Sequence, residues 1–403
     1  MTDESQRCSY ILPIKGRKCR MLVKKGKRFC GEHAIFYPDQ SERIQCPNDP
    51  RHTVNRSKLD DHLAKRCNSR LLPEPWIVPN VNVVEVKGEI ETQQCLSGRP
   101  SEEQLSRMST MIQMAFRKVS SRIIERVLRT PQIEDHMKLS KELSDAHRKH
   151  LVQLSSIIGN LMEANLLNND ADTCIIDLGA GKAQLSYWMA HVSPKSRFLL
   201  IDRTGCRNKY DNKALQEDPS LRFSRLRCSI EHLDLSRVDS AKGVQRLVAV
   251  CKHLCGSATD SGIRCILNAI SGGLDIYGFA LAPCCHHKSS FAQYTGKNFI
   301  TKCGIDGEDD FNVLRYIATW AVCGMMRVGE SQETEAANGA DMVENVSWNW
   351  TREQKENLGC QAKALLEIGR AEYLHSLGYT VNVYRYVDFS LSPENLLIVG
   401  TKN

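Results

Sequence analysis

The sequence predicts a doubly wound α/β sheet preceded by two small zinc modules. Strand-like and helix-like stretches alternate from residue 173 onward, which is typical of a parallel sheet with helices on both faces. A glycine turn joins the first of these strands to its helix. Two groups of cysteines and histidines occupy the first 67 residues, where apolar side chains are too few to form a core.

Length and composition limit the class of protein. With 403 residues the chain has room for one large domain and smaller attachments. No apolar run is long enough to cross a membrane, and the first residues, Met1–Gln6, do not resemble a secretory signal. The 17 cysteines therefore predict reduced thiols and metal ligands rather than disulfides. We expect a reducing intracellular compartment, cytoplasm or nucleus, with no membrane partner and no obligate protein partner.

Positive charge is concentrated at the amino-terminal end. Residues 1–70 hold 16 Lys and Arg against 8 Asp and Glu, a balance of +8, whereas the whole chain carries +7. A basic front end on a near-neutral body favours a polyanionic partner. A solvated basic terminus without a partner is the alternative.

The first module, residues 1–38, has three cysteines and one histidine with ten residues in each of the first two gaps: Cys8, Cys19, Cys30 and His33. The second, residues 43–70, has the order Cys-His-His-Cys: Cys46, His52, His62 and Cys67. Each set offers the four thiolate or imidazole ligands that a structural Zn²⁺ requires. The second resembles the small CHHC finger of minor-spliceosome and RNA-methyltransferase proteins. Scattered free cysteines are the alternative for the first module.

Residues 71–148 are predicted to be a linker and a helical connector. Three prolines between Leu71 and Pro79 exclude helix and favour an extended chain. From Ser101 apolar residues recur at helical spacing, which predicts a helix of about 25 residues that ends before Pro131. A second helix is expected over about 150–167, within the large domain assigned to residues 149–403.

The glycine turn follows a buried strand, 173–178, and opens a helix. Gly179 and Gly181 allow a close backbone approach to a ligand, and the helix start offers free N–H groups. A dinucleotide fingerprint would need a third glycine where Gln184 stands. Asp177, two residues before the first glycine, resembles the first motif of S-adenosylmethionine methyltransferases. An ordinary turn without a ligand is the alternative.

The next two strands add polar groups at their ends. Asp202 ends the strand 197–202 and can accept hydrogen bonds from both ribose hydroxyls of a nucleoside cofactor. Glu231 follows the third strand, with Asp234 nearby, and is a candidate for binding the adenine, although both can simply be surface residues. Ligands of such sheets bind at the carboxyl ends of the strands, where all these residues are expected.

The fourth and fifth strands also run into polar turns. Lys252 and His253 follow the strand 246–251, at the position where a substrate atom would meet the methyl group. We hypothesise that Lys252 polarises a substrate hydroxyl and that His253 accepts or orients its proton. A structural histidine is one alternative. A third metal bound by the cysteines and histidines at 251–255 and 284–287 is another.

The carboxyl-terminal part completes the sheet. Residues 329–347 are small and acidic, which predicts a mobile insertion. A helix over 351–377 and two closing strands, 380–387 and 395–399, follow, with the last strand inserted antiparallel.

Together, the CCCH and CHHC modules and three further stretches resemble one family: Cys251–Gly256, Pro283–His287 and Ser392–Asn395. It is the eukaryotic tRNA ribose 2′-O-methyltransferase family that acts on the fourth nucleotide, in the acceptor stem. The resemblance implies a Rossmann-like fold, S-adenosylmethionine as methyl donor, tRNA as substrate and Zn²⁺ in the front modules. It does not assign the catalytic residues.

Two other function classes are also compatible with this sequence. The first is a methyltransferase for an RNA base or a protein. A base-nitrogen enzyme would be expected to carry an Asn/Asp-Pro-Pro-aromatic turn after the fourth strand, where this chain has Lys252 and His253. The second is a zinc-finger RNA-binding protein with an inactive methyltransferase fold, which donor binding would distinguish.

Overall fold

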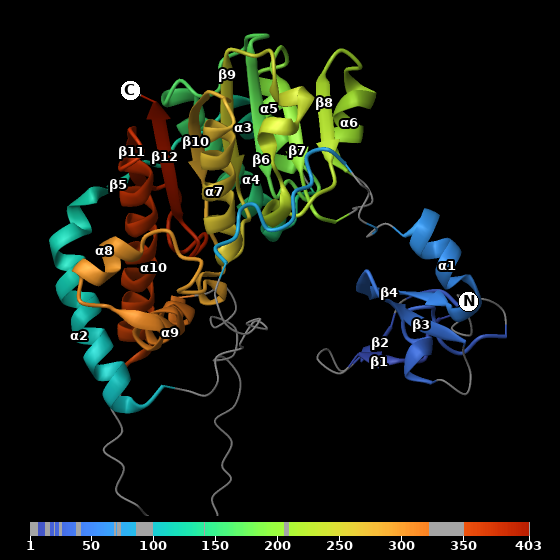
Figure 1. The fold of residues 1–403 in the computed structure, drawn as a ribbon, viewed down its shortest axis with the longest axis horizontal. Coiled ribbons are helices and arrows are strands. Elements are labelled where there is room, and N and C mark those ends of the chain that lie inside the picture. The colour runs from blue at the N-terminus through green and yellow to red at the C-terminus, as the bar shows by residue number, and fades with distance from the viewer. Residues whose placement is uncertain are drawn as a thin grey trace, which may run out of the picture. The chain divides into compact units, whose positions relative to one another are not determined.

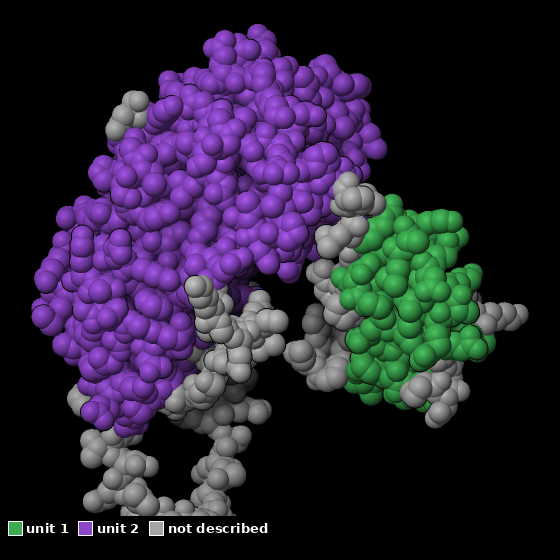
Figure 2. Space-filling view, viewed as in Figure 1, with its two compact units in different colours: residues 1–73 green, residues 74–403 purple. Residues whose placement is uncertain are grey.

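The computed structural model describes most of the chain: residues 7–12, 17–19, 21–23, 26–37, 42–67, 70, 74–85, 100–140, 142–204, 209–321 and 350–402. It divides into two compact units, residues 1–73 and 74–403 (Figure 2). The acidic insertion predicted at 329–347 lies outside the described residues. Within those residues, no helix combines the length and apolar character needed to cross a membrane.

The smaller unit consists of short strands and single helical turns. Two antiparallel pairs form it, β1 with β2 and β3 with β4. The elements are β1 (Ile11–Leu12), β2 (Arg17–Lys18), η2 (Ala34–Phe36), β3 (Arg43–Cys46), β4 (Asp49–Asn55), η4 (Arg56–Lys58), α1 (Leu59–Asp61) and η5 (His62–Arg66). Among the described residues of its first half, the buried apolar cluster consists of Phe29 and the cysteines 8, 19 and 30. So small a cluster contributes little stability by itself, and a bound metal would supply folding energy that the apolar side chains do not.

Eight strands of the larger unit form one twisted sheet in the order β5-β11-β12-β10-β9-β6-β7-β8 (Figure 1). They are β5 (Ile123–Glu125), β6 (Thr173–Leu178), β7 (Arg197–Ile201), β8 (Arg222–Leu226), β9 (Arg246–Cys251), β10 (Ile276–Leu281), β11 (Tyr379–Arg385) and β12 (Leu396–Lys402). Every pairing is parallel except those of β12, which lies antiparallel between β10 and β11. The predicted doubly wound sheet and its antiparallel last strand are both present.

Helices cover both faces because successive residues of the buried strands point to opposite sides. Ile176 packs in one core cluster with Ile263 and Ile368, from α7 and α10. Ile175 packs in the other with Leu151 and apolar residues of α3 and α5. The helices are α2 (Glu102–Val119), α3 (Pro131–Leu139), α4 (Asp145–Glu163), α5 (Gln184–Val192), α6 (Tyr210–Glu217), α7 (Ser257–Ser271), α8 (Lys297–Lys302), α9 (Gly307–Ala318) and α10 (Arg352–His375).

The connector differs from the sequence prediction. Ser101 and Gln104 form the expected capping box, but α2 ends at Val119 and the chain then enters β5, which pairs with β11. Ile123 and Ile124 fit a helical period and a strand equally well, and pairing with an open sheet edge decides for the strand. The helix packs through Leu105, Ile112 and other residues on α9 and α10 in a third apolar cluster.

The proline-containing segment after the small unit packs on the sheet domain. Residues 74–84 run along the turn that leaves β8, where the backbone of Ile77 forms a bridge with Leu233. The Asn82 side chain is fully buried and donates to the carbonyls of Ile230 and Leu233, at 2.6 and 2.8 Å. This segment therefore fixes the exit of β8, where Glu231 lies.

Candidate functional site

The strand order reverses between β6 and β9, because the chain runs outward from β6 to β8 and then returns to β9. A crevice outside the carboxyl ends of these strands is the usual ligand site of such sheets. The glycine turn after β6 lies there. Gly179 and Gly181 have φ of +77° and +51°, values that L side chains rarely adopt.

The two glycines have different surroundings. A Cβ at Gly179 would lie 3.1 Å from the carbonyl oxygen of His253 and from the Leu254 side chain, whereas a Cβ at Gly181 would meet no atom within 4 Å. Gly179 thus allows the turn after β9 to approach closely. Gly181 faces open space, which leaves room for a ligand to lie against the backbone.

Asp177 has a structural position behind the turn. It is buried, and its carboxylate accepts a 2.6 Å hydrogen bond from the Ser186 hydroxyl on α5. Burial raises its pKa to about 6 despite that hydrogen bond. Asp177 therefore holds α5 to β6 and supports the turn from behind.

Asp202 organises the open side of the turn. One carboxylate oxygen accepts the Gly181 amide at 2.8 Å, and the other accepts the amide and hydroxyl of Thr204, both at 2.7 Å. Arg225 on β8 donates to the Gly181 carbonyl at 3.1 Å and pairs with Asp211 at 2.9 Å. The carboxylate predicted to bind ribose hydroxyls thus lies directly beside the open glycine.

Glu231 lies in a single helical turn, Ile230–His232, at the exit of β8. Its carboxylate accepts a hydrogen bond from the Ser229 hydroxyl, and its carbonyl accepts the Asn82 amide at 3.1 Å. Glu231, which is predicted to bind the adenine, is therefore held through both its side chain and its backbone. It lies at the same edge of the sheet as Asp202.

Lys252 links two histidines at the exit of β9. Its amine lies 3.0 Å from Nδ1 of His150, on α4, and 3.3 Å from Nε2 of His253. Burial, then the Lys252 charge, lowers the pKa of His150 to about 3 and that of His253 to about 4. Burial also lowers the pKa of Lys252 to about 8. Near neutral pH both imidazoles are uncharged, and the lysine is easier to deprotonate than an ordinary lysine.

Behind these turns lies a network of buried charges. Arg370 of α10 pairs with Asp260 of α7 at 2.8 Å and with Glu367 at 2.6 Å. His286, after β10, lies 2.7 Å from Glu367 and 3.4 Å from Glu394, which also pairs with Lys363. The network fastens α7 and α10 to the turns that follow β10 and precede β12.

A pocket of about 380 Å³ opens beside this network. It lies between α10, the end of β11 and the start of β12, and its lining includes Phe116, Asn357, Gln361, Arg385, Phe389 and Glu394. The lining combines aromatic rings, amides and charged side chains.

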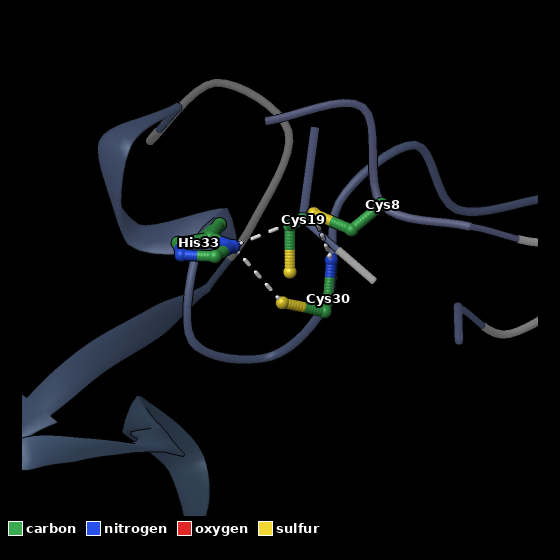
Figure 3. Close-up of side chains that lie close together, drawn as sticks. All are labelled: Cys8, Cys19, Cys30 and His33. Atoms are coloured by element: carbon green, nitrogen blue, oxygen red, sulfur yellow. Dashed lines mark hydrogen bonds between the residues drawn. The ribbon is translucent and has the colours of Figure 1, made fainter. Parts of the chain in front are cut away.

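The first module brings its predicted ligands together (Figure 3). Their ligand atoms all lie within 4.8 Å of one another, with His33 Nδ1 3.5 Å from Cys8 Sγ and 3.3 Å from Cys30 Sγ. Around tetrahedral Zn²⁺, with Zn–S of about 2.3 Å and Zn–N of about 2.0 Å, neighbouring ligand atoms lie about 3.3 to 3.8 Å apart. The donor set and its spacing fit that ion.

The second module has the same geometry. The Sγ atoms of Cys46 and Cys67 lie 3.6 Å apart, and the Nε2 atoms of His52 and His62 lie 3.1 Å apart. Mixed pairs span 3.3 Å between His62 and Cys46 and 3.8 Å between Cys67 and His52. These are again close to the edges of a zinc tetrahedron.

Comparison with known proteins identifies the family. The family model described as "Methyltransferase TRM13" matches residues 152–401, which is more than half of the chain. The chain belongs to the TRM13 methyltransferase family. Two further models match the small unit: the "CCCH zinc finger in TRM13 protein" over residues 6–34 and the "U11-48K-like CHHC zinc finger" over residues 43–68.

Curated relatives cover this chain almost completely. The mouse protein named "tRNA:m(4)X modification enzyme TRM13 homolog" is 30% identical, over 98% of this chain and 94% of its own. The human protein of the same name is 29% identical, over 98% and 95%. Among solved structures, the magnesium protoporphyrin IX methyltransferase of Synechocystis PCC 6803 covers 73% of this chain and all of its own, at 10% identity with a TM-score of 0.31, too low to support an inference.

These findings confirm the family resemblance, the Rossmann-like methyltransferase fold and the two predicted cofactors, S-adenosylmethionine and Zn²⁺. The roles of single site residues stay predictions. From the sequence, His150 could be placed only on a helix ahead of the glycine turn, with core and surface roles equally open, and its contact with Lys252 comes only through folding. Arg225 and Glu394 had no predicted role, because their contacts also depend on the tertiary structure.

Proposed function

We propose that this chain transfers a methyl group from S-adenosylmethionine to the ribose 2′-hydroxyl of nucleotide 4 of tRNA. Support for tRNA and for position 4 comes from the name of the mouse and human relatives, "tRNA:m(4)X modification enzyme". The observation that carries the choice of a hydroxyl is the position of the Lys252 amine between His150 Nδ1 and His253 Nε2 at the exit of β9. The division of labour proposed is zinc modules at 1–38 and 43–70, a connector at 71–148 and a catalytic domain at 149–403.

The donor-binding site would be the edge formed by β6, β7 and β8. The open side of Gly181 lets the donor lie close to the backbone. Asp202 accepts hydrogen bonds from the donor's ribose hydroxyls, and Glu231 faces its adenine. When bound there, S-adenosylmethionine supplies an electrophilic methyl group. Asp177 would act only indirectly, by holding the turn through Ser186.

A ribose 2′-hydroxyl is a poor nucleophile, so the protein must position it and remove its proton. An uncharged lysine has two N–H groups and one lone pair. In the observed geometry the two N–H groups can be donated to His150 Nδ1 and His253 Nε2, which leaves the lone pair free for the hydroxyl proton. Lys252 would then be the catalytic residue, and the two histidines would be positioning residues.

The pKa values favour this division between Lys252 and His253. A base with a pKa near the working pH is the most effective, and Lys252, at about 8, is far closer than His253, at about 4. Of the two roles predicted for His253, we therefore propose orientation of the proton rather than its acceptance.

The deciding experiment is product mapping. Total tRNA lacking the modification is incubated with the protein and a labelled methyl donor. One part of the product is cleaved to oligonucleotides to locate the methyl group, and another is digested to nucleosides to identify it, both by mass spectrometry. A 2′-O-methyl nucleoside at position 4 is the expected result. A methyl group on a base, or methylation of protein instead of tRNA, would refute the proposal.

A control separates chemistry from binding. Lys252→Gln should lose product while retaining affinity for the donor and for tRNA, since the side chain is proposed to act on the hydroxyl proton. Loss of donor affinity in this variant would mean that Lys252 belongs to the donor-binding site.

A further inference from the structure

A third group of thiols lies in the sheet domain, outside the two zinc modules. The ligand atoms of Cys255, Cys284 and Cys285 all lie within 4.8 Å of one another. Cys255 and Cys284 approach to 3.4 Å between their Sγ atoms. The methyl transfer described above does not use any of the three.

The fold brings these cysteines together through two adjacent strand exits. Strands β9 and β10 pair in parallel up to Cys251 and Leu281, and beyond them Cys255 and Cys284 form an isolated parallel bridge. The Gly256 amide donates to the Cys284 carbonyl at 3.0 Å. The segments that follow the two strands pack closely, because a Cβ at Gly256 would lie only 2.4 Å from the Lys288 backbone.

Cys285 adopts a costly backbone conformation in this group. Its φ is +52°, which is uncommon for a residue other than glycine, asparagine or aspartate. Such conformations persist where the surrounding structure maintains them, and they cluster at functional sites. The strained residue is the one that adds a third thiol to the pair.

The spacing matches a metal site better than a disulfide. The 3.4 Å separation resembles the 3.6 Å between Cys46 and Cys67 in the second zinc module, and a disulfide would need about 2.05 Å. Cys255 is exposed and Cys284 is buried, so an ion could enter from solvent and be held at the protein surface. Thiolates select soft ions such as Zn²⁺ over Mg²⁺ or Ca²⁺.

The sequence offered a broader set of possible ligands for a third metal, the cysteines and histidines at 251–255 and 284–287, and the structure brings three of them together. Cys251 is buried within β9, and His286 pairs with Glu367 and Glu394. Within the described part of the chain, no fourth Cys, His, Asp or Glu belongs to the group. Three protein ligands with one position left for water or another ligand is the arrangement of an open zinc site.

We propose that Cys255, Cys284 and Cys285 bind a third Zn²⁺ ion, with its fourth position open. The ion would connect the turn after β9 to the turn after β10. Its ligand Cys255 lies three residues beyond Lys252. The proposal concerns metal content and does not depend on which atom of tRNA is methylated.

The test is a metal count on the full chain, purified under reducing conditions without chelator. Elemental analysis should give three zinc ions per chain in the parent. Cys255→Ser and Cys285→Ser should each give two, because these accessible thiols can be replaced without disturbing the buried Cys284. Cys303→Ser, which changes a half-buried thiol outside the group, should retain three.

Cobalt substitution adds a measurement that misfolding would not imitate. The parent minus Cys255→Ser difference spectrum should show thiolate-to-cobalt charge transfer for one ion, with the thermal unfolding of the zinc modules unchanged. Two zinc ions in the parent, or an equal count in the parent and both variants, would overturn the proposal. So would a Cys255–Cys284 disulfide found by mass spectrometry in the reduced preparation.

Discussion

Lys252 is the residue whose protonation state the proposed chemistry depends on. With a pKa of about 8, its uncharged fraction rises about tenfold per pH unit below that value and levels off above it. We predict that the single-turnover methylation rate, at saturating donor and tRNA, follows the same curve. A rate independent of pH between about 6 and 8 would show that Lys252 is not the base.

Lys252→Arg provides the matched variant, because the guanidinium keeps its charge at every accessible pH. It should lower the rate by about a hundredfold or more and remove the dependence on pH near 8. Folding and donor affinity should remain those of the parent.

Gly179 and Gly181 form a second pair at the residue scale, since both have positive φ but only one meets other atoms. Alanine at either position should cost about 1–2 kcal/mol of folding free energy for the left-handed conformation. Gly179→Ala should cost more, because its Cβ would meet the His253 carbonyl and Leu254 at 3.1 Å.

Donor binding should reverse that order. Gly181→Ala fills the open side of the turn and should weaken S-adenosylmethionine binding at least about tenfold, or about 1.4 kcal/mol, in calorimetric titration. If Gly181→Ala binds the donor like the parent, the open side of the turn does not hold it.

At the scale of elements, helix α10 is held in place by ion pairs between buried side chains. Glu367 is fully buried and is paired with both Arg370 and His286. Burial alone would lower the pKa of His286, but the carboxylates of Glu367 and Glu394 raise it. The imidazole is therefore part of the charge balance at the exit of β10.

Removing one charge from this buried network leaves the opposite charges without compensation. Glu367→Gln should reduce the free energy of unfolding by about 3–5 kcal/mol. Glu353→Gln, on the exposed first turn of the same helix, should change it by less than about 0.5 kcal/mol. Urea unfolding of both variants gives the comparison, and an equal small effect would mean that the network contributes little to stability.

For the elements, sequence reasoning succeeded where the information was local. The glycine turn, the strand that precedes it and Asp202 are visible in short stretches, and the structure places them at one edge of the sheet. It was wrong about the end of α2, where Ile123 and Ile124 satisfy two periodicities and the partner strand β11 lies about 260 residues away.

Over the whole molecule, the information that the sequence lacked is tertiary. Lys252 could be placed at a strand end, but its partner His150 lies on α4, 102 residues earlier in the chain. Residues 74–84 show only that prolines prevent helix, and their packing against Ile230 and Leu233 depends on a buried asparagine. Neither contact has a periodicity or motif that would reveal it.

The uneven charge of the molecule leads to a prediction about tRNA binding. Residues 1–70 carry +8 and the remainder is close to neutral, so we predict that the small unit makes most of the phosphate contacts. Lys27, Arg28 and Lys65 are exposed there. Replacing all three by glutamine should weaken tRNA binding and lower the slope of log affinity against log salt by up to about one unit per lost contact.

A control of equal charge lies at the opposite edge of the sheet from the site. Lys195 and Lys242 precede β7 and β9, and Lys402 ends the antiparallel β12, so all three exposed lysines lie at the amino ends of the parallel strands. Their triple glutamine variant removes the same three charges from the chain. If only net charge matters, both triple variants will shift the salt dependence equally, and the small unit is not the phosphate-binding part. If the small unit makes the contacts, only the Lys27, Arg28 and Lys65 variant will lose slope, with donor affinity unchanged in both.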